Sequence, residues 1–224
     1  MEGSKRMLRN TFANNRDLII SGVFILFNLV GLIGLSLTSI RPSFLQVIPL
    51  HLLFMFILIV INHQQIDNWF LLFIILTCSL GFAAEWLGVH TNILFGKYYY
   101  GLVLGTKLAG IPLTICLNWF IVIYTVGVTT IRLKIKSTIA RIFTGAIILV
   151  LLDFLIEPVA MRFDYWHWQA NSVPLFNYVS WFFLSVIMLY FFELFKFKQQ
   201  NWAATVLLIS QFVFFAVFNI ERFV

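Results

Sequence analysis

The stretch AIILVLLDFLIEPVAMRFDYWHW, residues 146–168, decides the fold class, because an apolar run long enough for a membrane carries acids in its second half. Asp153 and Glu157 are four residues apart, so a helix places both side chains on one face, one turn apart. A charge at the centre of a bilayer costs about 2.5 to 3.5 kcal/mol on insertion scales. Acids inside a membrane segment are therefore functional candidates by default.

The composition of the whole chain is that of an integral membrane protein. Of its 224 residues, 61% are hydrophobic and only 11% are charged, whereas about a quarter are charged in soluble domains. The net charge of +6 comes from basic residues between apolar runs, where they set orientation, so no nucleic-acid function is expected. Cys78 and Cys116 lie in apolar runs without a ligand cluster, which argues against a metal site or a disulfide framework.

Seven apolar segments approach the length of about 20 residues that a membrane-spanning helix needs. They are roughly 18–38, 44–61, 69–89, 111–131, 139–159, 178–195 and 203–220. Because the connections are short, we expect an all-α, polytopic helical bundle that forms one domain over residues 1–224. Its bundle, 18–220, follows a polar segment, 1–17, that is too long for a signal peptide and lacks a cleavage site, so the first helix is expected to stay as an anchor.

Lysine and arginine are distributed unevenly between the two sides of this bundle. Ten lie on the side of the N-terminus and five on the other, which predicts a cytoplasmic N-terminus in the cell (inner) membrane. The ten are Lys5, Arg6, Arg9, Arg16, Arg132, Lys134, Lys136, Arg141, Lys196 and Lys198, and the five are Arg41, Lys97, Lys107, Arg162 and Arg222. The long connections 90–110 and 160–177 then share the non-cytoplasmic face.

A third acid joins the pair from another span, since Glu85 falls near the end of the third apolar segment. Two carboxyls close together in an apolar site cannot both ionise cheaply, so Asp153 and Glu157 are expected to act as a proton donor and a carboxylate acceptor. Pro158 is expected to end or kink the helix just after them.

Aromatic residues flank the acids in the runs YYY (98–100) and YWHW (165–168). Their ring faces can line a pocket and stabilise positive charge by about 0.5 to 2 kcal/mol each, although such runs also form belts at membrane interfaces. Two roles stay open for Asp164: a residue of the pocket, or the partner of Arg162 in an ion pair within the loop. Glu193 is expected to be an interfacial charge, and His51 and His63 to be packing or interface residues.

The sequence lacks the residues that several classes of membrane protein and enzyme require. The last span has no lysine for a retinal Schiff base, and four scattered histidines cannot supply the histidine boxes of membrane di-iron enzymes. The DDxxD pattern of prenyltransferases is absent, as are GxSxG and HExxH.

Taken together, these motifs resemble the carotenoid biosynthesis membrane proteins, whose characterised members hydrate the acyclic end of a carotenoid (the bisanhydrobacterioruberin and γ-carotene hydratases). The resemblance covers most of residues 80–182, and Asn92 departs from it by standing where a small residue is expected. The matching residues are Glu85, Gly88, Val89, Thr91, Phe95, Gly96, Tyr98, Tyr100, Gly110, Pro112, Leu113, Trp119, Asp153, Glu157, Pro158, Trp166 and Trp168.

The resemblance implies an enzyme that adds water across the terminal 1′,2′ double bond of a carotenoid without a cofactor or metal. Protonation gives a tertiary carbocation that water captures. Asp153 is the expected acid, and Glu157 or Glu85 the base. The expected substrate-binding residues are His90, Phe95, Tyr98, Tyr100, Trp119, Trp166 and Trp168. The expected partners are the lipid bilayer, a γ-carotene, lycopene or bisanhydrobacterioruberin type of substrate, and other enzymes of the carotenoid pathway.

Other functions stay open from the residues alone. An isoprenoid isomerase or cyclase also begins by protonating an alkene. A proton-coupled transporter would use the three acids as a relay, although no inverted repeat is evident. A scaffold role would leave the buried acids unexplained.

Overall fold

The computed structural model describes residues 2–197, 200 and 202–220, with side chains described from Asn15 onward, and it confirms the all-α bundle. The helices are α1 (Glu2–Ser36), α2 (Arg41–Gln46), α3 (Ile48–Asn62), α4 (Asn68–Thr91), α5 (Thr114–Arg132), α6 (Thr138–Arg162), α7 (Leu175–Leu194) and α8 (Ala203–Ile220). Four short strands lie in the connections: β1 (Tyr98–Tyr100), β2 (Lys107–Leu108), β3 (Ile111–Pro112) and β4 (Trp166–Trp168).

Six of these helices are long and apolar enough to cross a membrane, so the chain is a multi-pass membrane protein. The second predicted span, 44–61, is instead divided between α2 and α3. Pro42 and Pro49 stand in the first turns of these two helices, where the missing proline N–H breaks no helical hydrogen bond. With 15 residues, α3 is about 22 Å long, shorter than a hydrocarbon core of about 30 Å.

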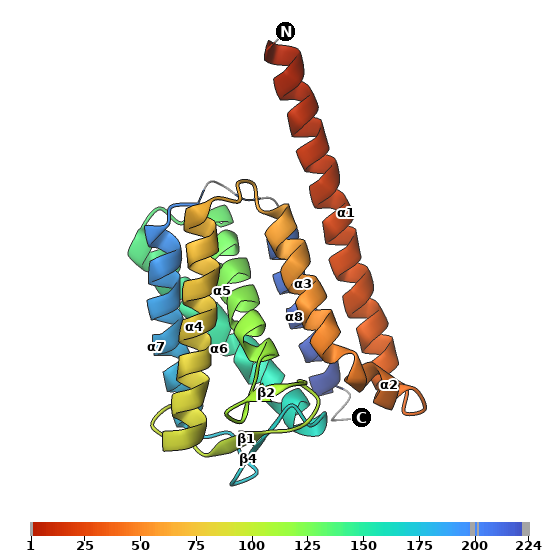
Figure 1. Ribbon diagram of the computed structural model, residues 1–224, viewed down its shortest axis with the longest axis vertical. Coiled ribbons are helices and arrows are strands. Elements are labelled where there is room, and N and C mark those ends of the chain that lie inside the picture. The colour runs from red at the N-terminus through yellow and green to blue at the C-terminus, as the bar shows by residue number, and fades with distance from the viewer. Residues whose placement is uncertain (1, 198–199, 201, 221–224) are drawn as a thin grey trace.

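The long helices run side by side, and α5 is the central one (Figure 1). Of the apolar span of α5, 72% is buried, compared with 28–39% for the other five. In Figure 1, α1 extends beyond the bundle at the end where the chain starts, and the strands gather at the opposite end. The two long connections therefore meet at one end of the bundle, as the alternation of spans predicts.

A carboxyl group of α1 holds the start of α8. Asp17 accepts hydrogen bonds from the backbone N–H groups of Trp202 and Ala203, both at 2.9 Å. Because the first amides of a helix have no partner within it, this contact caps α8 from a neighbouring helix. Asp67 and Ser137 cap α4 and α6 directly, each by accepting from the amide three residues onward.

Two polar side chains outside the acid cluster hold helices together. Glu193 of α7 forms a two-pronged ion pair with Arg141 of α6, with both N–O distances at 2.6 Å. Its partner is thus Arg141 and not the nearby Lys196. The ring of His63 stacks on Phe70 with centroids 3.6 Å apart, and its Nδ1 lies 2.7 Å from the hydroxyl of Tyr124, which is the packing role expected for it.

Candidate active site

The two acids of α6 lie on one buried face, each with 1% of its surface exposed. The helix does not end at Pro158, so that part of the prediction is wrong, and α6 continues to Arg162. A neighbouring helix supplies a donor close to the proline, because Asn219 of α8 donates its Nδ2 to the carbonyl of Leu155 at 2.8 Å. Donors of this kind let a proline stay inside a membrane helix.

An amide from α7 joins the two carboxyls. Asn177 is 1% exposed, and its Nδ2 donates to Asp153 Oδ2 at 2.8 Å and to Glu157 Oε1 at 3.1 Å. The other oxygen of Asp153, Oδ1, is buried and has no hydrogen-bond partner among the described residues. Asn177 was not among the predicted site residues; its only signal in the sequence is a lone amide in the apolar run that follows Pro174.

The aromatic runs of the two long connections pair with each other. Strands β1 and β4 are antiparallel, with Tyr98 opposite Trp168 and Tyr100 opposite Trp166. Side chains alternate between the two faces of a strand, so these four rings share one face, and Tyr99, 58% exposed, lies on the other. We call this pair of strands, residues 98–100 and 166–168, the aromatic ribbon.

The aromatic ribbon donates hydrogen bonds to carboxyls on two different helices. At one carboxyl, the Nε1 groups of Trp166 and Trp168 donate to Glu157 Oε2 at 2.9 and 2.6 Å. At the other, the hydroxyls of Tyr98 and Tyr100 donate to Glu85 Oε2 at 2.5 and 2.6 Å. The ribbon thus brings Glu85 of α4 to the same site as the acids of α6, as the sequence analysis expected.

Glu85 has one more donor, and the tyrosines remain neutral. Trp119 of α5 donates its Nε1 to Glu85 Oε1 at 2.9 Å. Burial is the larger cause and the negative charge of Glu85 the second cause that raises the pKa of both Tyr98 and Tyr100 well above the usual value of a phenol. The charge of Glu157 also raises the pKa of Tyr98, which places that hydroxyl under the influence of both carboxyls.

Further rings enclose this cluster. Trp119 stacks on Trp181 of α7 with centroids 4.1 Å apart, and Phe95 packs edge-on against Tyr98 at 6.1 Å. The backbone N–H of Phe95 donates to Ser180 Oγ at 3.1 Å. The loop before the aromatic ribbon is therefore held against α7. Phe95 and Trp119, both predicted as site residues, lie within this cluster of rings.

A glycine of α4 leaves the space that Tyr98 occupies. A Cβ at Gly88 would lie 2.7 Å from the Tyr98 hydroxyl and 2.8 Å from a ring carbon of Phe95. We expect Gly88→Ala to lower the free energy of unfolding by about 1 to 3 kcal/mol, because overpacking forces both rings to move. Thermal unfolding in detergent measures this. The matched control is Gly22→Ala in α1, where nothing lies within 4 Å and stability should hold; equal effects of the two changes would contradict the prediction.

Two residues singled out from the sequence lie away from the carboxyls. His90 is exposed, stacks on Trp86 with centroids 4.9 Å apart, and has its Nδ1 2.9 Å from the Trp86 carbonyl. It follows that the structure does not bring His90 to the acids. Asn92, the departure from the family pattern, ends α4 in a left-handed conformation with φ of 56°, a position that asparagine tolerates.

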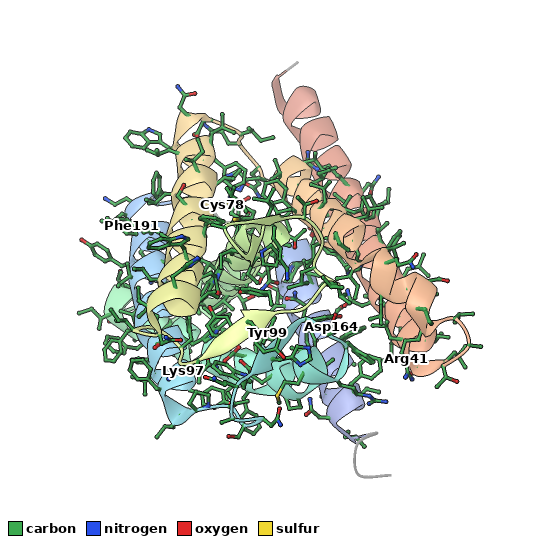
Figure 2. The ribbon with its side chains drawn as sticks, turned by 60° about the horizontal axis from the view of Figure 1, so that its bottom comes forward. Arg41, Cys78, Lys97, Tyr99, Asp164 and Phe191 are labelled. Carbon is green, nitrogen blue, oxygen red and sulfur yellow. The ribbon has the colours of Figure 1, made fainter. Side chains whose placement is uncertain are left out.

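Asp164 belongs to a turn on the outer side of the aromatic ribbon, near Tyr99 (Figure 2). It accepts from the Leu102 amide at 2.9 Å, and its Oδ1 lies 2.7 Å from His167 Nε2. Partial burial alone would raise its pKa, but the hydrogen bonds from His167 and Leu102, together with the charges of His167 and Lys107, lower the pKa overall. Its partner in the loop is therefore His167 and not Arg162.

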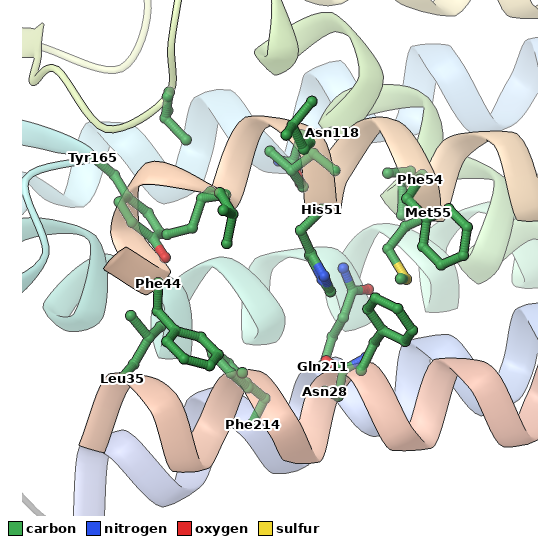
Figure 3. Close-up of a pocket in the computed structure, with 18 of the residues that line it drawn as sticks. Asn28, Leu35, Phe44, His51, Phe54, Met55, Asn118, Tyr165, Gln211 and Phe214 are labelled. Carbon is green, nitrogen blue, oxygen red and sulfur yellow. The ribbon is translucent and has the colours of Figure 1, made fainter. Parts of the chain in front are cut away.

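A cavity of about 440 Å³ adjoins the carboxyl site (Figure 3). Its walls come mainly from α1, α3, α5 and α8, with Ile156, Tyr165 and Trp166 at the side of α6. Small-molecule sites typically measure about 300 to 1,000 Å³. Trp166 lines the cavity while its Nε1 binds Glu157, so this ring connects the cavity wall to the acids.

No metal-binding group of three or more His, Cys, Asp or Glu side chains occurs within the described part of the chain. Cys78 and Cys116 are both free and half-buried. The polar groups of the site are carboxyls and phenols, which can hold and transfer protons, and amide and indole N–H groups, which donate hydrogen bonds to the carboxyls.

Comparison with known proteins identifies a family. The model of a family described as carotenoid biosynthesis protein matches residues 46–223, which include every residue of the site described above. Neither the curated proteins nor the solved structures contain a match. Since the family model covers most of the chain, this multi-pass membrane protein belongs to the carotenoid biosynthesis protein family.

Proposed function

We propose that the protein is a carotenoid hydratase that adds water across the terminal double bond of an acyclic carotenoid end. The observation that carries this proposal is the buried carboxyl pair. Asp153 and Glu157 share the amide of Asn177, and one oxygen of Asp153 has no partner in the described structure. Family membership supplies the substrate class, and the carboxyl pair supplies the acid and base that hydration requires.

The reaction needs a proton at one carbon and water at the next. A neutral carboxylic acid protonates the less substituted alkene carbon, which leaves a tertiary carbocation. Water bonds to the cation, and a carboxylate removes the extra proton to give a tertiary alcohol. Return of that proton to the first carboxyl restores the enzyme, so the net change is the addition of one water and no electrons are exchanged.

The numbers of hydrogen-bond donors support a division of roles between the acids. Glu157 and Glu85 each accept from three side chains, an arrangement that favours a carboxylate. Among the described residues, Asp153 accepts only from Asn177. Asp153 is accordingly the group that holds the transferable proton, Glu157 receives the proton of water, and Glu85 holds the tyrosines of the aromatic ribbon.

The aromatic ribbon suits a cationic intermediate. Trp166 and Trp168 stand beside Glu157, and Tyr98 packs against Trp168 with centroids 5.2 Å apart. Ring faces stabilise a positive charge by about 0.5 to 2 kcal/mol each and do not react with it as a second carboxylate would. The polyene itself would lie in the apolar cavity, whose wall includes Trp166.

Expression in a bacterial host that makes lycopene or γ-carotene tests the reaction. We expect pigments heavier by one water for each reacted end, detected by mass spectrometry, with the protein in the cell (inner) membrane beside the other pathway enzymes. A new pigment of unchanged mass would overturn hydration in favour of isomerisation or cyclisation. Unchanged pigments in both hosts, with the protein present in the membrane, would also contradict the proposal for these two substrates.

A further inference from the structure

The cavity and the acids are separate in this structure. Among the described residues that line the cavity there is no Asp or Glu, so neither Asp153 nor Glu157 is part of its wall. On the side of α6 the wall consists of Ile156, Tyr165 and Trp166, and Figure 3 shows Tyr165 at this side. A chain that fills the cavity therefore has no direct contact with either carboxyl.

Trp166 touches both the cavity and the acid site. Its ring belongs to the cavity wall, and its Nε1 donates to Glu157 Oε2 at 2.9 Å. Of the described lining residues, it is the one that also forms a hydrogen bond with a carboxyl of the site. The Trp166 ring thus stands where the cavity and Glu157 come closest to joining.

The ring of Trp166 is held less tightly than the ring of Trp168. Trp168 is buried, and its ring packs against Tyr98 with centroids 5.2 Å apart. Trp166 is only partly buried, and its ring neighbours, Tyr100 and Tyr165, both lie at 6.2 Å. Trp166 can accordingly turn about its side-chain bonds while Trp168 keeps its place.

Such a movement would leave the carboxyl of Glu157 in position. Trp168 Nε1 donates to the same oxygen at 2.6 Å, and Asn177 Nδ2 donates to the other oxygen at 3.1 Å. Loss of the bond from Trp166 removes one donor of three. The acid site therefore keeps its geometry when the Trp166 ring moves away.

The opposite side of the cavity faces the bilayer. Its exposed lining residues are all apolar and lie on α1 and at or near the start of α3: Phe27, Val30, Val47 and Leu50. Because α1 is a candidate membrane span, hydrocarbon chains of the bilayer can enter the cavity between these two helices. Without a barrier at Trp166, any such chain would reach the carboxyls.

We propose that Trp166 is a gate between the cavity and the acids and that its ring determines which chains reach Asp153 and Glu157. The closed position is the one in this structure, with Nε1 bound to Glu157. In the open position the ring turns away from Glu157, and the end of the chain takes its place. This proposal rests on the proposed function, since it adds a specificity-determining residue to the same site.

Labelling of the acids in the absence of turnover tests the gate. The full chain in nanodiscs is treated with dicyclohexylcarbodiimide, an apolar reagent that enters the bilayer and modifies carboxyl groups, and peptide mass spectrometry measures the label on Asp153 and Glu157. Trp166→Phe keeps a ring and loses the bond to Glu157, so labelling should be about tenfold faster, as the loss of one hydrogen bond to a charged group allows. Trp166→Ala should be faster still. Unchanged labelling in both variants would overturn the proposal.

The matched control removes the neighbouring donor and leaves the gate in place. Trp168→Phe takes an N–H group from the same oxygen of Glu157, but Trp168 does not line the cavity. It corrects for any change in the protonation of Glu157. Labelling in Trp166→Phe should exceed labelling in Trp168→Phe, and equal increases in the two variants would contradict a gate at Trp166. The label on Glu193, at the far end of the bundle, should stay constant in every variant; an equal rise there would show general opening of the protein instead.

A filled cavity tests the route of the reagent. Gly31 lines the cavity, and a Cβ there would lie 3.5 Å from Phe214, which is ordinary contact. Gly31→Leu added to Trp166→Ala should therefore slow the labelling again. If it did not, the reagent would reach the acids by another path, and Trp166 would not separate them from the cavity. Because none of these measurements depends on water addition, failure of the gate and failure of the hydratase reaction are distinguishable.

Discussion

Asp153→Asn is expected to lower the hydration of an acyclic carotenoid by about 10² to 10⁴-fold, the contribution of a positioned general acid. Asparagine has nearly the shape of aspartate and still offers an oxygen to the Asn177 amide, which now donates to Asp153 at 2.8 Å. It cannot give a proton to carbon. Conversion by purified protein, measured as pigment mass against time, reports the loss, and protein yield reports folding.

The matched control makes the same acid-to-amide change outside the site. Asp164 lies in the turn beside the aromatic ribbon with φ of 60°, a left-handed conformation that asparagine accepts. Asp164→Asn should therefore keep most of the conversion. If Asp153→Asn protein hydrated its substrate at the rate of the unchanged protein, Asp153 would not be the acid.

The apolar runs predicted the helices well, because a run of about 20 apolar residues has few alternatives to a membrane helix. Local proline rules were less reliable. Pro158 was expected to end or kink α6, and it does not end it: the helix continues to Arg162, and Asn219 of α8 donates to the nearby carbonyl of Leu155. Such help from a distant helix has no signature in the local sequence.

Asp153 and Glu157 were chosen as site candidates from their four-residue spacing, and Glu85 from its place near the end of an apolar segment, but the contacts that join them were not predicted. Glu85 and Glu157 are linked through the paired strands β1 and β4. Each strand has three residues, and the two lie far apart in the chain. Strands so short give no periodic signal. Asn177 is a single amide in an apolar helix, so no spacing pattern marks it, whereas His90 looked like a site residue and lies exposed.

Glu85→Gln is the other change with a large expected effect: we expect hydration to be abolished and thermal stability to fall. The carboxylate now faces three donors, from Tyr98, Tyr100 and Trp119. The amide of glutamine presents its own N–H groups to some of them, so at least one buried donor loses its acceptor at a cost of about 1 to 3 kcal/mol. The aromatic ribbon would then shift relative to the acids of α6.

A comparison at the far end of the bundle separates this effect from general destabilisation. Glu193→Gln removes the charge that pairs with Arg141 at 2.6 Å and should lower the unfolding temperature while conversion continues. Glu85→Gln should lower both. Full conversion by the Glu85→Gln protein would contradict a role for Glu85.

A variant of the two tyrosines distinguishes a positioning role of Glu85 from a direct role in proton transfer. In the double variant Tyr98→Phe with Tyr100→Phe, the Glu85 carboxyl remains but two of its three donors are gone. If Glu85 acts by holding the ribbon, this variant should lose hydration nearly as completely as Glu85→Gln. If conversion persists in the double variant and is lost only in Glu85→Gln, the carboxyl of Glu85 itself takes part in the proton transfer. Glu85 of α4, and not Glu157, would then be the base that receives the proton of water.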